Sequence, residues 1–337
     1  MRPAFRFAAL AAAGALCLTP VVAGSWGNTG HRIIGVLAVQ ALPAEVPAFL
    51  RSKQAAADMG ELAREPDRSK GAGKIHDSNR DPAHFIDLGD DGRVLGGPAF
   101  ADMPPTRAEY ETSLRAAKID SWKAGYLQYS IVDAWQQLVK DFAYWRVDVA
   151  AEKRAKGERK RFYKRDRQRR EALLLANLGN LAHYVGDGSQ PLHASVHYNG
   201  WGDYPNPNGY TTDRIHGPFE GPFVKGAVTP QMALAAMPAF SDCDCPVETR
   251  VVGYLTRTQT FVEPLYRLWG QGGFQPGDPR GAAFAAERIG AGAGELRDLI
   301  VIAWRASASA KVGWPEVSVA DVESGKADPY ESLVGKD

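Results

Sequence analysis

Residues 33–43 read Ile-Ile-Gly-Val-Leu-Ala-Val-Gln-Ala-Leu-Pro, and this stretch indicates the fold class. Counted from Ile34, apolar residues recur three, four, seven and eight positions later, which is the spacing of one face of an amphipathic helix. Ile33 extends the apolar stripe, and Pro43 marks its end because proline cannot continue a helix. The stretch therefore predicts a helix whose apolar side packs into a core.

Similar helical patterns run through four further segments, at 125–148, 171–187, 247–269 and 279–305. Strand-like alternation is scarce, so we expect a mainly α fold, a single compact multi-helix domain over residues 26–337. Three long segments rich in Gly, Pro, Asp and Asn separate the helical patterns, at roughly 64–107, 188–216 and 238–246. Loops of that length inside a compact domain are typically functional or disordered.

The composition is that of an ordinary globular protein. The 337 residues carry a formal charge of +1, with 45% apolar and 23% charged residues, which argues against a disordered chain, collagen or a coiled coil. Basic residues and an apolar run ending in small residues precede Trp26, so we expect residues 1–25 to be a secretory signal peptide and the mature protein to be secreted or periplasmic. Only Cys243 and Cys245 then remain, and their spacing predicts a local disulfide.

Residues 151–170 form a strongly basic segment, with eleven Lys or Arg against three acids. A solvated helical extension accounts for such a run. The sharper alternative is an electrostatic guide for a polyanion, such as nucleic acid or anionic lipid. Only Phe162 and Tyr163 interleave with the charges, which is too few aromatic rings for a base-stacking platform.

Histidines next to acids are the strongest functional signal. His183 and Asp187 are four residues apart, as are His216 and Glu220, and this spacing places two side chains on one face of a helix. His193 follows the first pair closely. One such histidine alone more often satisfies a hydrogen bond, but imidazoles with carboxylates are the ligands that zinc takes where thiols are absent. The set predicts more than one metal ion.

Four motifs, taken in order, resemble the single-strand-specific three-zinc nucleases, whose structural relatives are the zinc-dependent phospholipase C enzymes. They are Trp-Gly-Asn-Thr-Gly-His at 26–31, His-Phe-Ile-Asp at 84–87, His-Tyr-Val-Gly-Asp-Gly-Ser-Gln-Pro-Leu-His at 183–193 and His-Gly-Pro-Phe-Glu at 216–220. The resemblance implies a trinuclear zinc cleft and a zinc-dependent hydrolase of phosphate esters. Its expected activity is endonucleolytic cleavage of single-stranded DNA or RNA, with removal of 3′-phosphates as a further expectation.

The resemblance also implies a ligand set for three Zn²⁺ ions, made of one processed terminus, five imidazoles and three carboxylates. Grouped by ion, the expected ligands are Asp67, His84, His183 and Asp187; the backbone amine and carbonyl of Trp26 with His31 and a bridging Asp187; and His193, His216 and Glu220. An amine must be free to bind zinc, so cleavage before Trp26 would complete the second site.

Asp67 and Asp187 are the expected catalytic carboxylates, because either could orient the attacking water. At the Asp67 position Asp77 and Asp81 compete. The family places an arginine three residues after this acid, where the present chain has Lys70. The arginine that would steady the phosphate is therefore Arg68 or absent.

The residues around the metals leave the substrate class open. Phe85 could stack a base and Asp87 could accept from a base edge, whereas a core phenylalanine and a helix-capping aspartate are the alternatives. The spacing between the motifs resembles that of the nucleases. Glu220 and the aromatic loop residues Tyr198, Trp201 and Tyr204 differ from the residues that the nucleases have there. We expect a nuclease that needs no protein partner. The alternatives are a phospholipase C acting on phospholipid head groups, and a non-catalytic zinc or polyanion binder.

Overall fold

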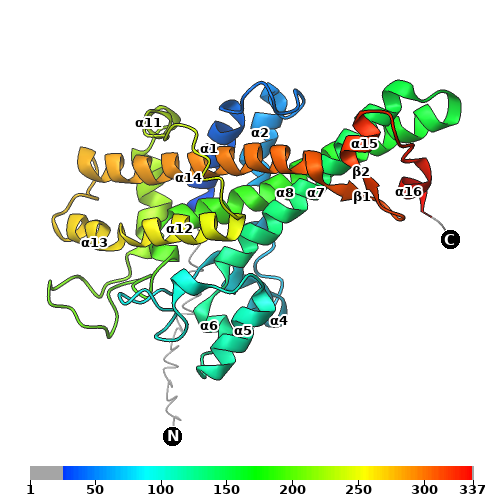
Figure 1. Cartoon of the computed structure of the whole chain (residues 1–337). Helices are drawn as coiled ribbons and strands as arrows, with labels where there is room; N and C mark the ends of the chain where they lie inside the picture. The colour runs from blue at the N-terminus through cyan, green and yellow to red at the C-terminus, as the bar shows by residue number, and fades with distance from the viewer. Residues whose placement is uncertain (1–25, 336–337) are drawn as a thin grey trace, which may run out of the picture.

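A computed structural model describes residues 26–335 and is mainly helical, as the sequence predicts. Five long helices dominate it: α1 (Gly27–Gln40), α7 (Leu127–Arg154), α8 (Gly157–Ser189), α12 (Val247–Gln259) and α14 (Pro279–Ala306). Figure 1 shows α14 lying across α1, α7 and α8, with α12 on the same side of the molecule. Three of the metal-ligand candidates, His31, His183 and Asp187, lie where α1 and α8 meet.

Shorter elements connect these helices. The short α-helices are α2 (Lys53–Leu62), α3 (Glu65–Arg68), α4 (Lys74–Arg80), α5 (Arg107–Ala116), α6 (Ser121–Ala124), α9 (His216–Pro218), α10 (Val224–Ala227), α11 (Pro230–Ala235), α13 (Val262–Gly270), α15 (Val319–Glu323) and α16 (Tyr330–Val334). Tighter or wider turns are η1 (Asp81–His84), η2 (Phe100–Asp102), η3 (Pro191–His193), η4 (Phe219–Phe223) and η5 (Ser307–Ser309). Within residues 26–335 the strands are β1 (Lys311–Val312) and β2 (Val317–Ser318), an antiparallel hairpin.

Two helix boundaries differ from the prediction. The basic segment is helical throughout except at residues 155–156, because α7 runs to Arg154 and α8 begins at Gly157. The predicted helix 247–269 is wrong as one element, since it divides into α12 and α13. Pro264 lacks an amide proton and fits only the first turn of a helix, and the Thr260 hydroxyl donates to the Arg257 carbonyl at 2.7 Å.

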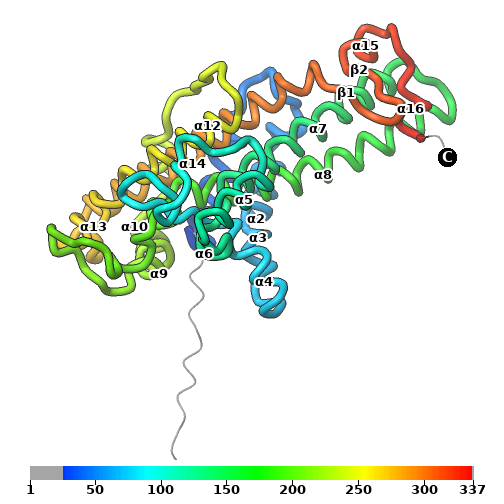
Figure 2. Tube along the Cα trace, turned by 60° about the horizontal axis from the view of Figure 1, so that its bottom comes forward, coloured from blue at the N-terminus to red at the C-terminus, as the bar shows by residue number. Residues whose placement is uncertain are grey.

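Two hydrophobic clusters stabilise different parts of the molecule. The main cluster fills the space between α1, α7, α8, α12 and α14. A smaller one, around Val147, Val312 and Val322, joins α7 to the hairpin and α15. In Figure 2 the paired α7 and α8 leave the main body and carry this second cluster near their far end. We call this projection, residues 143–170 with residues 311–335, the arm.

Two further expectations concern the chain ends and cysteines. Cys243 and Cys245 are joined by a disulfide, as their spacing predicts. The expected signal peptide, residues 1–25, lies outside the described residues. Among the helices of residues 26–335, none is both long and apolar enough to span a bilayer.

Candidate metal centre

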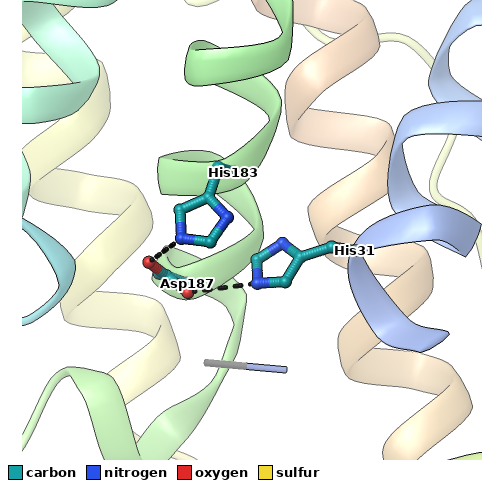
Figure 3. Close-up of side chains that lie close together, drawn as sticks. All are labelled: His31, His183 and Asp187. Carbon is teal, nitrogen blue, oxygen red and sulfur yellow. Dashed lines mark ion pairs between the residues drawn. The ribbon is translucent and has the colours of Figure 1, made fainter. Parts of the chain in front are cut away.

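The C-terminal end of α8 is the framework of the site. His183 and Asp187 lie one turn apart on this helix, and α1 brings His31 against them (Figure 3). The close approach of α1 depends on Gly186, because a Cβ atom there would lie 2.8 Å from Nδ1 of His31. All three side chains are fully buried.

Asp187 lies at the centre of the first group of ligands. Its Oδ1 is 3.4 Å from Nε2 of His31. Its Oδ2 is 3.0 Å from Nδ1 of His84 and 3.3 Å from Nε2 of His183. The two carboxylate oxygens therefore face different imidazoles, which is the arrangement that a carboxylate bridging two ions requires.

Asp67 joins this group from α3. Its Oδ1 lies 3.8 Å from Nε2 of His183, and Asp67, His84 and His183 could together hold one ion. Asp77 instead binds His76 at 2.9 Å, so it does not compete for the position. The structure brings Lys70 to 2.7 Å from Oδ1 of Asp67.

Arg68, the arginine considered for the phosphate, is engaged elsewhere. It forms ion pairs with Glu61 at 2.8 Å and with Glu65 at 2.5 Å, on an exposed surface. The ammonium group next to the metal ligands is therefore that of Lys70.

A second group forms where η3 meets α9. Nε2 of His216 lies 3.1 Å from Nε2 of His193 and 2.8 Å from Oε2 of Glu220. His216 begins α9, as the position of Pro218 predicts. Gln190, which the sequence analysis did not single out, donates to Oε2 of Glu220 at 3.2 Å. In the sequence, Gln190 lies between the ligand candidates Asp187 and His193, and this position could have identified it.

Backbone carbonyls orient two of the imidazoles. Nδ1 of His183 donates to the carbonyl of Ala63 at 2.9 Å, and Nδ1 of His193 donates to the carbonyl of His84 at 2.7 Å. A neutral imidazole that donates through Nδ1 presents a lone pair at Nε2. These lone pairs face other ligand atoms, which requires a cation between them, either a proton or a metal ion.

Buried atoms in the second group fit a metal ion. Oε1 of Glu220 and Nδ1 of His216 are buried, and among residues 26–335 neither has a hydrogen-bond partner. Such atoms are costly to bury unless a cation or a water binds them.

The ligand set as a whole has five imidazoles and three carboxylates, in three groups that can each hold a metal ion.

The pKa shifts of Asp187, Asp67 and His84 suit metal binding. Burial opposes protonation of His183, but the carboxylates of Asp187 and Asp67 raise its pKa, so this imidazole must lose a proton when a metal ion binds. Burial opposes ionisation of Asp187, but His183 and His193 hold its pKa well below the usual range. Burial also opposes ionisation of Asp67, and the charges of His183 and Lys70 nevertheless lower its pKa to about 2. Burial lowers the pKa of His84 to about 4. Ionised carboxylates and a neutral imidazole are the forms that bind metals.

Trp26 lies beside the same end of α8. Its indole nitrogen donates to Oγ of Ser189 at 2.7 Å, and its side chain is fully buried. Its carbonyl accepts from the amide of Gly30 at 3.1 Å, as the first turn of α1. The tryptophan is thus both a core aromatic and a neighbour of Asp187, and these two interpretations do not exclude each other.

Phe85 and Asp87 follow His84 in an extended stretch. Phe85 is half-buried, and Asp87 is 9% exposed. Asp87 lies between two bridge residues, not at a helix start, so the helix-capping interpretation is wrong. Burial raises its pKa to about 8, so at neutral pH this carboxyl group can donate a proton to a hydrogen bond as well as accept one.

The aromatic loop is ordered by His197, a residue that the sequence analysis missed. Nδ1 of His197 donates to the Trp201 carbonyl at 2.7 Å, and Nε2 lies 3.0 Å from Oδ1 of Asp90. The His197 ring stacks on Trp201 at 3.7 Å. Trp201 is buried, so only Tyr198 and Tyr204 present exposed rings. The four-residue spacing between His193 and His197 in the sequence could have identified this residue.

A cleft of about 680 Å³ opens beside the first group. His84 and Tyr184 line it near the metal ligands. Charged residues of both signs also line it, namely Arg80, Arg107, Glu65 and Asp133. It continues along α8 past Asn180. A substrate bound there would lie next to His84. A comparison with models of known protein families finds no match, and a comparison with curated proteins finds no matching relative.

Proposed function

We propose that the chain is a zinc-dependent phosphodiesterase of the three-zinc nuclease type, which hydrolyses single-stranded DNA or RNA. The observation that carries the proposal is the set of three His, Asp and Glu groups within one buried centre, two of which share His183. A donor set without thiols favours zinc over softer metals. The expected location is outside the cytoplasm, after cleavage before Trp26.

The proposed ligands follow the three groups. Asp67, His84 and His183 would hold one ion, His31 and Asp187 another with the Trp26 terminus, and His193, His216 and Glu220 the third. Zinc bound at these positions supplies Lewis-acid catalysis and lowers the pKa of water towards about 7.

The chain's own side chains have separate tasks in the proposed reaction. The Asp67 carboxylate, which is ionised and partly exposed, would accept a hydrogen bond from the attacking water and align it. Lys70, held at 2.7 Å from Asp67, would balance the charge of the scissile phosphate. The arginines of the cleft would bind neighbouring phosphates.

A phospholipase C is the second candidate, and the aromatic loop favours it. Tyr198 and Tyr204 expose rings of the kind that can enclose a quaternary ammonium group. Against it, the basic residues of α8 suit a polyanion better than a single head group.

The test is hydrolysis of both substrate classes by purified mature protein. We expect acid-soluble nucleotides from single-stranded DNA, loss of this activity in a chelator, and its return with zinc. His183→Ala should abolish activity and zinc binding. His76→Ala is the matched control, because His76 belongs to none of the three groups. Release of phosphocholine without release of nucleotides would overturn the nuclease in favour of the phospholipase.

A further inference from the structure

Three exposed arginines form a row on the helix that carries His183 and Asp187. Arg161, Arg165 and Arg169 are spaced four residues apart on α8. Like charges at this spacing destabilise a helix, so helix stability does not account for the row. Arg161 pairs with Glu158 and Arg169 with Asp166, whereas no ion pair joins Arg165 to an acid within residues 26–335.

The row lies on the face of α8 that carries His183. Asn177, Asn180 and Tyr184 line the cleft on its α8 side and step away from the metal ligands towards the row. At about 100° per residue, Arg165 lies on the same face of α8 as His183, and Arg161 and Arg169 lie about 40° to either side of it. The exposed residues Ala172 and Ala176 lie on this face between the row and His183, and the exposed side chain of Leu173 lies beside them.

The distance between the row and the metal centre is fixed by one continuous helix. At a rise of about 1.5 Å per residue, Arg169 lies about 21 Å and Arg161 about 33 Å along α8 from His183. The contact of Tyr163 with Tyr330 and the ion pair of Arg159 with Asp328 hold the arm together. A stacked strand that advances about 3.4 Å per nucleotide would cover this distance with roughly 6 to 10 nucleotides.

We propose that Arg161, Arg165 and Arg169 bind the backbone phosphates of a single-stranded nucleic acid whose scissile bond lies at the metal centre. The proposal rests on the nuclease function. Guanidinium groups suit phosphates because they bind two oxygens at once. Phe162 and Tyr163 contact Tyr330 within the arm, so this surface reads no base, and binding is independent of sequence and sensitive to salt.

The test compares two triple variants of the arm. Arg161→Gln, Arg165→Gln and Arg169→Gln remove the row. Lys156→Gln, Lys160→Gln and Lys164→Gln are the matched control. They remove the same charge from exposed positions. Lys164 and Lys160 lie about 100° and 140° around α8 from His183, and Lys156 directly precedes the helix.

Hydrolysis of a thymidine 20-mer and of a thymidine dinucleotide is measured with each protein. For the 20-mer, the arginine variant should raise KM at least tenfold with kcat unchanged, and the slope of log KM against log salt should fall by about 2. The dinucleotide is too short to reach the row, so its kinetics should not change. The lysine variant should resemble the wild-type protein.

Three results would overturn the proposal. Equal effects of the two variants would mean that net charge matters and the row does not. An unchanged KM for the 20-mer would mean that the strand leaves the cleft elsewhere. Wild-type binding to vesicles with anionic lipid that only the arginine variant loses, without any change in the 20-mer KM, would assign the row to membranes. If the wild-type protein cleaves neither oligonucleotide, the nuclease proposal itself fails. Binding of a phosphorothioate thymidine 20-mer, measured by fluorescence anisotropy, then still tests whether the three arginines bind a single strand.

Discussion

Asp148→Asn should remove a large part of the pH dependence of stability. Asp148 lies on α7 within the arm and is fully buried, and burial together with the nearby Asp166 carboxylate raises its pKa to about 8. Between about pH 4 and pH 8 the unfolded chain has released this proton and the folded protein retains it. The folded protein therefore loses stability as the pH rises through this range.

The size of the effect follows from the shift. The pKa change of Asp148 from 3.8 to about 8 corresponds to a loss of roughly 1.4 kcal/mol per pH unit and to an upper limit of about 6 kcal/mol over the range. Asparagine cannot ionise, so the variant should match the wild-type free energy of unfolding near pH 4 and exceed it by several kcal/mol at pH 8.

The assay is urea unfolding, followed by circular dichroism, at pH values from 4 to 8. Asp102→Asn is the control, because Asp102 is exposed in the folded protein as it is in the unfolded chain. Parallel stability curves for Asp148→Asn and the wild-type protein would refute the reasoning, since they would show that Asp148 is ionised in the fold.

Two other substitutions test the support of the metal centre. Gly186→Ala should displace His31, whose Nδ1 would lie 2.8 Å from the new Cβ, and zinc analysis should find less than the wild-type content in a folded protein. Gln190→Ala should remove the hydrogen bond to Glu220 and weaken zinc binding at that group by about 10- to 100-fold, measured by competition with a chelator. Wild-type zinc affinity in either variant would contradict the assigned support.

Local spacing explains what could be predicted from the sequence. His183 and Asp187 share a face of α8 because both lie on one helix, and the same holds for His216 and Glu220 next to Pro218. Such pairs can be predicted from the sequence without knowledge of the tertiary structure. The long helices, too, follow from local periodicity, except where Pro264 divides one of them. The short helices α3 and α4 do not, because they lie in the segment 64–107 that was predicted as a loop.

Positions set by tertiary packing could not be predicted in this way. Asp67 was one of three candidate acids, and only the packing of α3 against α8 brings it to His183. The role of His197 depends on contacts with Asp90 and Trp201, which no periodicity reports. The burial of Asp87, which raises its pKa, depends on the distant residues around Ala124.

The most direct test of the account is the metal content of mature protein that begins at Trp26, measured by mass spectrometry of the elements alongside Asp187→Ala. The account predicts three zinc ions per wild-type chain. It also predicts the loss of at least one ion in the variant, whose carboxylate faces His31 on one side and His84 on the other. A wild-type protein without stoichiometric metal, or a variant that keeps all three ions, would contradict it.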